Sequence, residues 1–534
     1  MENINILDCT LRDGGYINDW NFKRQNIKKI INNLFKSRIE IVECGFLNNK
    51  REYSEDRSVF DTVDRIAEFL PEDRGETKYV CMINYGEYEA VDIPEYSGKS
   101  INGIRIAFHK EKVDEAIKLC HEISKKGYLV FVQPMVTNNY TDMELLNLIK
   151  KVNKTKIFAF YIADSFGVMK QNDLLRMFYI IDKNLREDIY VGYHAHNNLQ
   201  MAYSNAQTFI LAQSKRKRIV DSSVFGMGRG AGNLNSELFT QHLNDNFNKS
   251  YKVYPLLQII DDILNRIYAK NYWGYSLPYF LSATFNCHPN YASYLSEKNT
   301  LTIKSISDIL NMITNDEKSS FNKEYIEELY LNHQKQLIND KKSIFNLREK
   351  FKHRNVLIVA PGGSIEKFNK EINDVIKKEN ALVISINFIS NKIFPDYIFI
   401  SNEKRFEKLV ENKKLTDLNI KLILTSNINT SSNLDIIVNY NDLLNNIYAV
   451  KDNSALMLLK LLSKLEVNKI FIAGLDGYVN NELDNYVSED MVYNTSIKLI
   501  EEMNEGMKTA FEGLTQEMNI LFVTPTRYVD ETKH

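Results

Sequence analysis

The sequence predicts an α/β protein that begins with a (β/α)8 (TIM) barrel and ends with a Rossmann-like α/β domain. Eight short apolar runs typical of strands occur in the first 240 residues, and amphipathic helical stretches separate most of them. One βα unit takes roughly 30 residues. Eight units in 240 residues therefore match a closed barrel with eight parallel strands. An open doubly wound sheet is the alternative.

The barrel is expected over residues 1–242, and the rest of the chain divides into three segments. Residues 243–340 lack strand patterns and carry helical ones, such as PLLQIIDDILNRIYAK, so we expect a helical extension packed on the barrel. Residues 341–354 are polar and charged, which predicts a linker. Residues 355–534 start with a new strand pattern, NVLIVAPGGSI, and further alternation predicts the Rossmann-like domain.

Composition restricts the function classes. Lys and Arg number 67 against 69 Asp and Glu, so there is no basic field to attract nucleic acid. Five cysteines without a C-x-x-C pair favour a reducing compartment over a disulfide framework. The first residues lack a signal-peptide pattern, and no apolar run is long enough to span a membrane. We expect a soluble, cytoplasmic homo-oligomer that acts on small molecules.

Polar or ionisable side chains stand at or near the ends of seven consecutive predicted strands. Active sites of (β/α)8 barrels lie at the carboxyl ends of the strands, where core packing does not call for such groups. In strand order these residues are Asp13, Glu43, Asn84, Arg105 with His109, Gln133, Asp164 with Ser165, and His194 with His196.

The motif GYHAHNN indicates a metal site. Alternate residues of a strand face the same side, so His194 and His196 can present both imidazoles to one point. Asp13 from the first strand could complete a set of two histidines and one carboxylate. Nitrogen and oxygen ligands fit Mn²⁺ or Mg²⁺ best, with Co²⁺, Zn²⁺ or Fe²⁺ as alternatives. The alternative is that both histidines are hydrogen-bonded side chains of the barrel core and bind no metal.

Two further elements accompany this motif. Arg12, beside Asp13, can place a permanent positive charge where negative charge develops on a substrate oxygen; alternatively it only forms a salt bridge with Glu43. The run GMGRGAGN after the eighth strand lets the backbone approach a ligand closely, although such a run alone is usually a turn.

Taken in order, DCTLRDGG, ECGF, ADSFG, GYHAHNN and GMGRGAGN resemble the metal-dependent lyase and aldolase barrels of the hydroxymethylglutaryl-CoA lyase type, most nearly the 4-hydroxy-2-oxovalerate aldolase branch. The resemblance implies that Asp13, His194 and His196 bind the metal, with Asn233 as a further ligand. It also implies that Arg12 stabilises an enolate and that Asp164 and Ser165 line the substrate pocket. We expect Glu43 and Gln133 at the substrate as well.

The resemblance implies an aldolase that makes or breaks a carbon–carbon bond beside the carbonyl of a 2-oxo acid such as pyruvate, with an aldehyde as second substrate. One departure concerns the base, because that branch has a histidine where this chain has Tyr16. Tyr16, His109 and a metal-bound hydroxide are the alternatives. Condensation or cleavage of an acyl-CoA, and a barrel that is only a scaffold, are the rival functions.

The sequence motifs of the C-terminal domain indicate its function less specifically than those of the barrel. The PGGS turn could aim a helix N-terminus at phosphate, and polar residues follow several strands. Their order resembles bacterial sialyltransferases that use CMP-sugars and related methylpterin-diphosphokinase-like domains. The resemblance implies a nucleotide or nucleotide-sugar site and a place in carbohydrate or surface-polysaccharide biosynthesis; the alternative is a docking or oligomerisation domain. The expected nucleotide-binding residues are Gly362, Gly363, Ser364, Asn387 and Asp476.

Overall fold

The computed structural model describes residues 4–411, 420–428, 436–480, 485–488, 491–492 and 497–529. The chain forms two compact units. The first, called the barrel unit below, contains residues 1–292 and 314–321, and the second, called the sheet unit, contains 293–313 and 322–534. The segment 243–340, predicted as one helical extension, thus contributes to both units.

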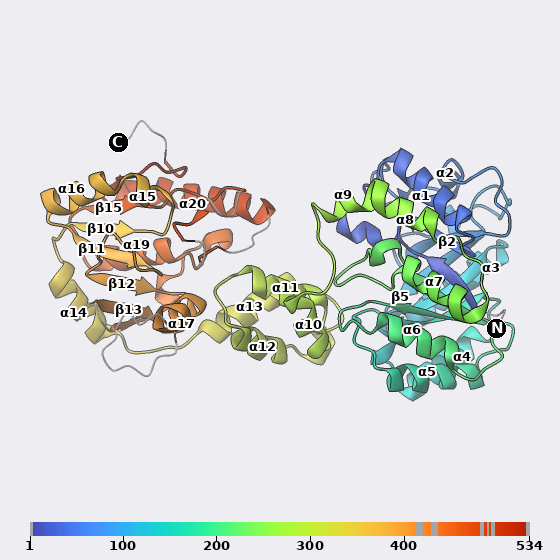
Figure 1. Ribbon diagram of the computed structural model, residues 1–534. Coiled ribbons are helices and arrows are strands. Elements are labelled where there is room, and N and C mark those ends of the chain that lie inside the picture. The colour runs from blue at the N-terminus through green and yellow to red at the C-terminus, as the bar shows by residue number, and fades with distance from the viewer. Residues whose placement is uncertain are drawn as a thin grey trace. The chain divides into compact units, whose positions relative to one another are not determined.

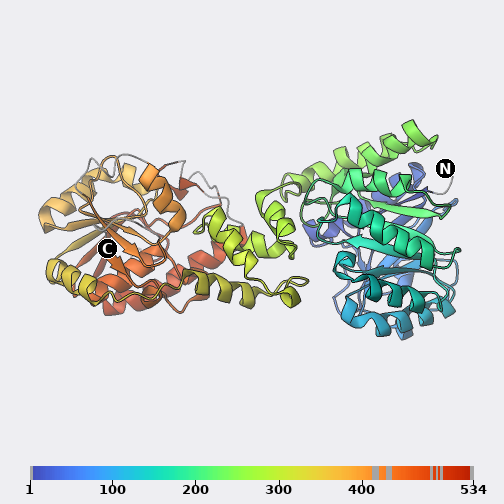
Figure 2. The ribbon, with the colours of Figure 1, turned by 90° about the horizontal axis from the view of Figure 1, so that it is seen from below.

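The barrel unit is a closed ring of eight parallel strands, as predicted (Figure 1, Figure 2). Strand β1 pairs with both β2 and β9, which closes the ring. A two-residue strand, β3 (Val59–Phe60), pairs with the end of β2 outside the ring. The ring strands are β1 (Ile4–Asp8), β2 (Ile41–Leu47), β4 (Lys78–Asn84), β5 (Gly103–Phe108), β6 (Leu129–Pro134), β7 (Ala159–Asp164), β8 (Tyr190–Ala195) and β9 (Arg218–Ser222).

Amphipathic helices cover the outside of the ring (Figure 2). In α3, for example, Ala116, Leu119 and Ile123 are buried while intervening polar residues face water, the spacing of one helix face. The outer helices are α1 (Arg24–Lys36), α2 (Val63–Ala67), α3 (Val113–Lys125), α4 (Asp142–Val152), α5 (Gln171–Asn184), α6 (Ala202–Leu211) and α7 (Ser236–Phe247).

Helices alone follow the ring, as the sequence predicts for 243–340. They are α8 (Tyr254–Ile259), α9 (Asn265–Tyr268), α10 (Leu277–Thr284), α11 (Pro289–Glu297), α12 (Ile303–Asn311) and α13 (Lys323–Gln334). The predicted linker 341–354 is largely helix α14 (Lys341–Phe351). Leu347 and Phe351 of α14 are fully buried in the core of the sheet unit, so this segment is a packed element of that unit.

The sheet unit contains a seven-stranded sheet in which every pairing is parallel, in the order β14-β13-β12-β11-β10-β15-β16. The chain adds strands outward from β10 and then returns to the other side of it, which makes a topological switch between β10 and β15. This order suits the predicted Rossmann-like class, which stays a prediction. The strands are β10 (Val356–Val359), β11 (Leu382–Ile386), β12 (Tyr397–Ile400), β13 (Lys421–Thr425), β14 (Ile436–Val438), β15 (Ile470–Ala473) and β16 (Ile520–Phe522).

The helices of this sheet are α15 (Ser364–Lys367), α16 (Asn369–Glu379), α17 (Glu403–Glu411), α19 (Ser454–Lys464) and α20 (Ile497–Glu517). Helix α19 is the most apolar: Leu458, Leu459, Leu461 and Leu462 are all fully buried. Among the described residues, no helix is both long and apolar enough to cross a bilayer.

Candidate active site

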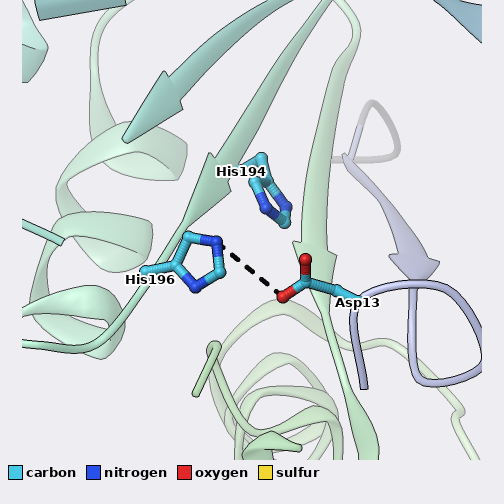
Figure 3. Close-up of side chains that lie close together, drawn as sticks. All are labelled: Asp13, His194 and His196. Carbon is cyan, nitrogen blue, oxygen red and sulfur yellow. Dashed lines mark ion pairs between the residues drawn. The ribbon is translucent and has the colours of Figure 1, made fainter. Parts of the chain in front are cut away.

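Asp13, His194 and His196 meet at the carboxyl end of the ring (Figure 3). One ligand atom from each lies within 4.8 Å of the other two, and all three side chains are buried. The Nε2 atom of His196 lies 3.8 Å from Oδ2 of Asp13. His194 lies in strand β8 and His196 directly follows the end of that strand, where it forms an isolated bridge with Asn233. The turn after β1 carries the carboxylate of Asp13. Two imidazoles and one carboxylate form a set that binds divalent metals.

Hydrogen bonds fix the orientation of both imidazoles. Nδ1 of His194 lies 3.0 Å from Oδ2 of Asp221, and Nδ1 of His196 lies 3.1 Å from the carbonyl oxygen of Arg229. Since a carboxylate and a carbonyl only accept hydrogen bonds, each Nδ1 is the donor and each Nε2 keeps its lone pair. Histidines that bind metals are typically held in this way.

Asn233 fits the role of a further ligand. Its Nδ2 donates to Oδ2 of Asp13 at 2.7 Å, whereas its buried Oδ1 has no hydrogen-bond partner within the described residues. A buried amide oxygen without a partner costs free energy that a bound cation would recover. Glycine is required nearby, because a Cβ on Gly228 would lie 2.2 Å from Nδ2 of Asn233 and 2.7 Å from Oδ2 of Asp13.

Arg12 forms the salt bridge with Glu43 that the sequence offered as the alternative to a role at the substrate, and it also pairs with Asp13. Its Nε lies 2.8 Å from Oε2 of Glu43 and its Nη1 lies 2.5 Å from Oδ1 of Asp13. Trp20 holds the backbone here by donating from Nε1 to the Arg12 carbonyl at 2.7 Å. The remaining Nη2 is buried and has no hydrogen-bond partner in the described chain. Both N–H groups of Nη2 are thus without a partner in the described chain.

A second buried arginine connects the predicted substrate residues to one another. Arg105 is fully buried, and its guanidinium contacts Glu43 at 3.0 Å, Asp221 at 2.6 Å and the amide oxygen of Gln133. The carboxylate of Glu43 therefore lies between two guanidinium groups. The positions of Glu43 and Gln133 indicate that they hold the arginines, where the sequence predicted contact with substrate.

The charges of the site keep the ligands in their metal-binding forms. Burial alone would raise the pKa of Asp13, but Arg12 and the two histidines hold it below its ordinary range. Burial lowers the pKa of His196 to about 3. Asp13 is thus an anion and His196 a neutral imidazole at neutral pH, and metal ligation requires both forms.

Asp164 and Ser165 serve mainly the loop that follows β7. Oδ1 and Oδ2 of Asp164 accept hydrogen bonds from the backbone N–H groups of Val168 and Met169 at 2.9 and 3.1 Å. Burial raises the pKa of Asp164 to about 7. Oγ of Ser165 accepts from the N–H of Val136 at 2.9 Å. These contacts shape the rim of the ring, and the predicted contact of both residues with substrate stays a prediction.

The two side chains proposed as base differ in their surroundings. Tyr16 lies in the short 3-10 turn after Asp13, with its ring 4.8 Å from that of Trp20 and 5.5 Å from the guanidinium carbon of Arg229. Tyr16 is 40% exposed, and partial desolvation shifts the pKa of its phenol upward from its ordinary value. The phenol therefore carries its proton at neutral pH, as an unperturbed tyrosine does. His109 ends β5 at the same rim and is partly buried.

Three residues at the rim were not predicted. Asp221 lies inside β9, whereas the polar residues predicted at strand ends came from the other seven strands of the ring. Arg229 was present in the glycine-rich run, but its side chain received no role. His288 comes from the segment before α11, and its ring lies 6.0 Å from that of Phe166, next to Ser165. A lone histidine among helical patterns carries no signal of this position.

In the sheet unit, the predicted phosphate site is filled by a side chain of the protein. Oδ2 of Asp476 accepts from the N–H of Ser364 at 2.9 Å, and Oδ1 accepts from its hydroxyl. The Asp476 carboxylate thus takes the place that the sequence suggested for phosphate. Gly362 is needed for this packing, since a Cβ there would lie 2.3 Å from the carbonyl of Gly474. Gly363 only precedes the single turn α15.

Asn387 is the one member of that predicted set that lines a cavity found in the described part of the chain. It lines a cavity of about 240 Å³ within the sheet unit. The cavity lies at the carboxyl ends of the strands and is also lined by Pro361, Arg405 and Ser454. The side chain of Asn387 donates to Oγ of Ser454 at 2.8 Å.

Comparisons with known proteins find relatives of the part of the chain that forms the barrel. Residues 3–263 match the family model described as HMGL-like. A 4-hydroxy-2-oxovalerate aldolase of Geobacillus genomosp. 3 is 25% identical over 250 residues, which covers 45% of this chain and 70% of that protein. An oxaloacetate decarboxylase of Mycobacterium tuberculosis is 23% identical over 244 residues, 43% of this chain and 67% of the relative.

One solved structure is similar to this chain over a longer part of its length. The N-terminal domain of a proposed aldolase from Bacteroides vulgatus shares 27% sequence identity with a TM-score of 0.50, covering 57% of this chain and 98% of that one. The barrel thus matches the HMGL-like family model over residues 3–263. Its relatives are named aldolases and lyases, which supports a carbon–carbon lyase. These comparisons do not support the sialyltransferase-like resemblance suggested for residues 355–534.

Proposed function

We propose that the barrel is a divalent-metal-dependent aldolase that makes or cleaves a carbon–carbon bond through the enolate of a 2-oxo acid of the pyruvate type. The observation that carries this proposal is the convergence of Asp13, His194 and His196 beside the unpartnered Nη2 of Arg12. The donor set of nitrogen and oxygen atoms without sulfur fits Mn²⁺ or Mg²⁺.

The residues of the site have separate roles in the proposed reaction. A divalent ion held by Asp13, His194, His196 and Oδ1 of Asn233 would bind a 2-oxo acid and act as a Lewis acid on its carbonyl. Arg12 donates from Nη2 to the oxygen on which negative charge develops. In the synthetic direction, carbon 3 of the enolate attacks the aldehyde carbon, and the aldehyde oxygen takes up a proton.

In this reaction Tyr16 acts as a proton donor. A phenol has an ordinary pKa of about 10, so Tyr16 carries its proton at neutral pH and can supply one to the alkoxide formed on addition. The base that removes the proton from carbon 3 is then His109 or a hydroxide at the metal, and mutation of His109 separates the two.

The test is exchange of the methyl protons of pyruvate with D₂O, which needs no aldehyde. The purified full chain with Mn²⁺ is expected to catalyse exchange, and His194→Ala and His196→Ala are each expected to abolish it. His121→Ala, at an exposed histidine of α3, is the matched control. Exchange at the parent rate in both variants would contradict the ligand assignment.

Two rivals are tested in the same experiment. Exchange with acetyl-CoA but not with pyruvate would identify an acyl-CoA condensing enzyme or lyase. A chain that binds no stoichiometric divalent ion and exchanges neither substrate would be a barrel scaffold.

For the sheet unit we propose a nucleotide-linked sugar as ligand, bound in the cavity lined by Asn387, which would place the chain in carbohydrate or surface-polysaccharide biosynthesis. The cavity lies near the switch between β10 and β15, where open parallel sheets bind ligands. Calorimetric titration of the full chain with CMP and UDP tests this, with Asn387→Ala expected to weaken binding. Absence of binding to both would leave a docking or oligomerisation role.

A further inference from the structure

Arg229 lies beside the candidate metal ligands and, among the residues that the structure describes, forms no ion pair with a carboxylate. Its carbonyl oxygen holds His196, so its backbone is fixed at the site. Its guanidinium carbon lies 5.5 Å from the centre of the Tyr16 ring, and Nη2 makes only a long contact of 3.4 Å with the carbonyl of Ser165. In the described part of the chain, no carboxylate forms an ion pair with this guanidinium.

The other buried arginines of the ring differ from Arg229 because their guanidinium groups have partners within the protein. Arg12 pairs with Asp13 and Glu43, Arg105 with Glu43 and Asp221, and Arg216 with Asp182. Arg218 has no carboxylate partner among the described residues, but its guanidinium donates to four backbone carbonyl oxygens, those of Phe209, Ile210, Ala212 and Ser214. Each of these charges is thus compensated within the protein. Arg229 is partly buried, and a partly buried guanidinium without a counter-charge is costly unless a ligand supplies one.

The charge of Arg229 acts on the surrounding site. It helps to lower the pKa values of Asp13 and His196 and opposes the rise in the pKa of Tyr16. It therefore lies close enough to influence a molecule that also reaches the metal position. Because a guanidinium matches carboxylate and phosphate geometry, its natural partner is one of these two groups.

His288 adds a neutral hydrogen-bond donor to the same rim. Its Nδ1 accepts from the N–H of Asn290 at 3.2 Å, so the proton of the neutral imidazole is on Nε2. Burial, with the charge of Arg229, lowers the pKa of His288 to about 3, so the ring stays neutral. Tyr16, Arg229 and His288 thus offer a phenol, a guanidinium and an imidazole N–H from three distant segments.

We propose that this rim is the subsite of the second substrate and that the aldehyde carries an anionic group, a carboxylate or a phosphate, which Arg229 binds. This inference rests on the proposed aldolase function and adds the class of the aldehyde. Arg229 is a binding and specificity-determining residue here, and His288 is a donor to an oxygen of the same substrate.

The test compares aldehydes of matched length in pyruvate-dependent addition by the full chain with Mn²⁺. Succinic semialdehyde is paired with butanal, and glyceraldehyde 3-phosphate with glyceraldehyde, so that the two arms separate carboxylate from phosphate. The readout is the ratio of kcat/KM for the charged and uncharged aldehyde, which cancels any general loss of activity. The parent is expected to favour the charged member of at least one pair by about 10- to 100-fold.

Arg229→Gln is expected to bring that ratio close to one, and Arg229→Lys to restore part of it because the charge returns without the planar fork. Arg176→Gln, at an exposed arginine of α5, is the matched control and is expected to keep the parent ratio. A parent enzyme that favours the uncharged aldehydes, or an Arg229→Gln ratio equal to that of the parent, would overturn the inference. Loss of pyruvate exchange in the parent would instead reject the proposed function.

Discussion

Nδ1 of His194 lies 3.0 Å from Oδ2 of Asp221, and the same carboxylate oxygen lies 2.6 Å from Nη2 of Arg105. Asp221 thus joins a metal ligand to the buried arginine that also contacts Glu43. Burial alone would raise the pKa of Asp221, but Arg105 and His194 hold it below its ordinary value. The carboxylate is therefore charged and fixes the tautomer of His194.

Asp221→Asn is expected to weaken Mn²⁺ binding by about 10- to 100-fold, the usual effect of losing a hydrogen-bond partner of a metal-binding histidine. The amide can no longer accept from both His194 and Arg105 through one charged oxygen. Calorimetric titration with Mn²⁺ measures the effect. Asp182→Asn, which breaks a comparable pair with Arg216 away from the site, controls for the loss of a buried carboxylate. Equal affinities in the two variants would remove the positioning role of Asp221.

Arg12→Ala is expected to slow pyruvate exchange while Mn²⁺ stays bound. The lost N–H group faces the oxygen on which charge develops, and removal of one such donor raises a reaction barrier by about 2.7–4 kcal/mol. Exchange rates at saturating Mn²⁺ and pyruvate, measured by NMR, give the change in the reaction barrier. Arg12→Lys keeps a charge but cannot contact Glu43 and the substrate together, so little rescue is expected. An unchanged rate in Arg12→Ala would limit Arg12 to a salt bridge with Glu43.

Local sequence patterns predict the ring and the candidate metal ligands because both depend on short-range periodicity. Strand repeats give the eight strands, and the two-residue spacing of His194 and His196 directs both rings to one side. Asp13 follows from the rule that strand ends form the site. Each of these inferences uses geometry that one strand carries by itself.

Tertiary packing decides the rest, which is why the sequence does not predict it. Asp221 reaches His194 only because β8 and β9 are neighbours in a particular register. His288 reaches the rim because the segment before α11 docks on the loop after β6, where Asn138 donates to Asn286 at 3.3 Å. The PGGS turn matches an anion site locally, but Asp476, more than 100 residues later, fills it.

Gly228→Ala is expected to lower Mn²⁺ affinity by about tenfold or more, because the new Cβ would overlap Nδ2 of Asn233 and crowd Asp13. Forcing extra atoms into a packed site also costs about 1–3 kcal/mol of stability. Gly513→Ala in α20, where a Cβ meets no atom within 4 Å, is the control and should leave Mn²⁺ binding intact. Parent-like affinity in Gly228→Ala would show that Asn233 can move without loss.

The buried carboxyl of Asp8 gives the barrel a pH-dependent stability that is separate from the metal site. Asp8 is fully buried, where it accepts hydrogen bonds from Oγ of Ser236 at 2.7 Å and the N–H of Thr10 at 3.0 Å. Burial raises its pKa to about 6, opposed by these hydrogen bonds and reinforced by the charge of Glu237. The folded state therefore binds the proton more tightly than the unfolded chain does.

The free energy of unfolding should thus fall as pH rises from about 4 to about 6 and change little above that range, by about 3 kcal/mol in total for this group. Asp8→Asn removes the titrating proton, so urea unfolding of this variant should lose that slope and show a more stable barrel at pH 7. Asp64→Asn, at an exposed position of α2, should follow the parent. Parallel slopes in the parent and Asp8→Asn would show that the carboxyl titrates alike in the folded and unfolded states, because only a difference in proton affinity between these states makes stability depend on pH.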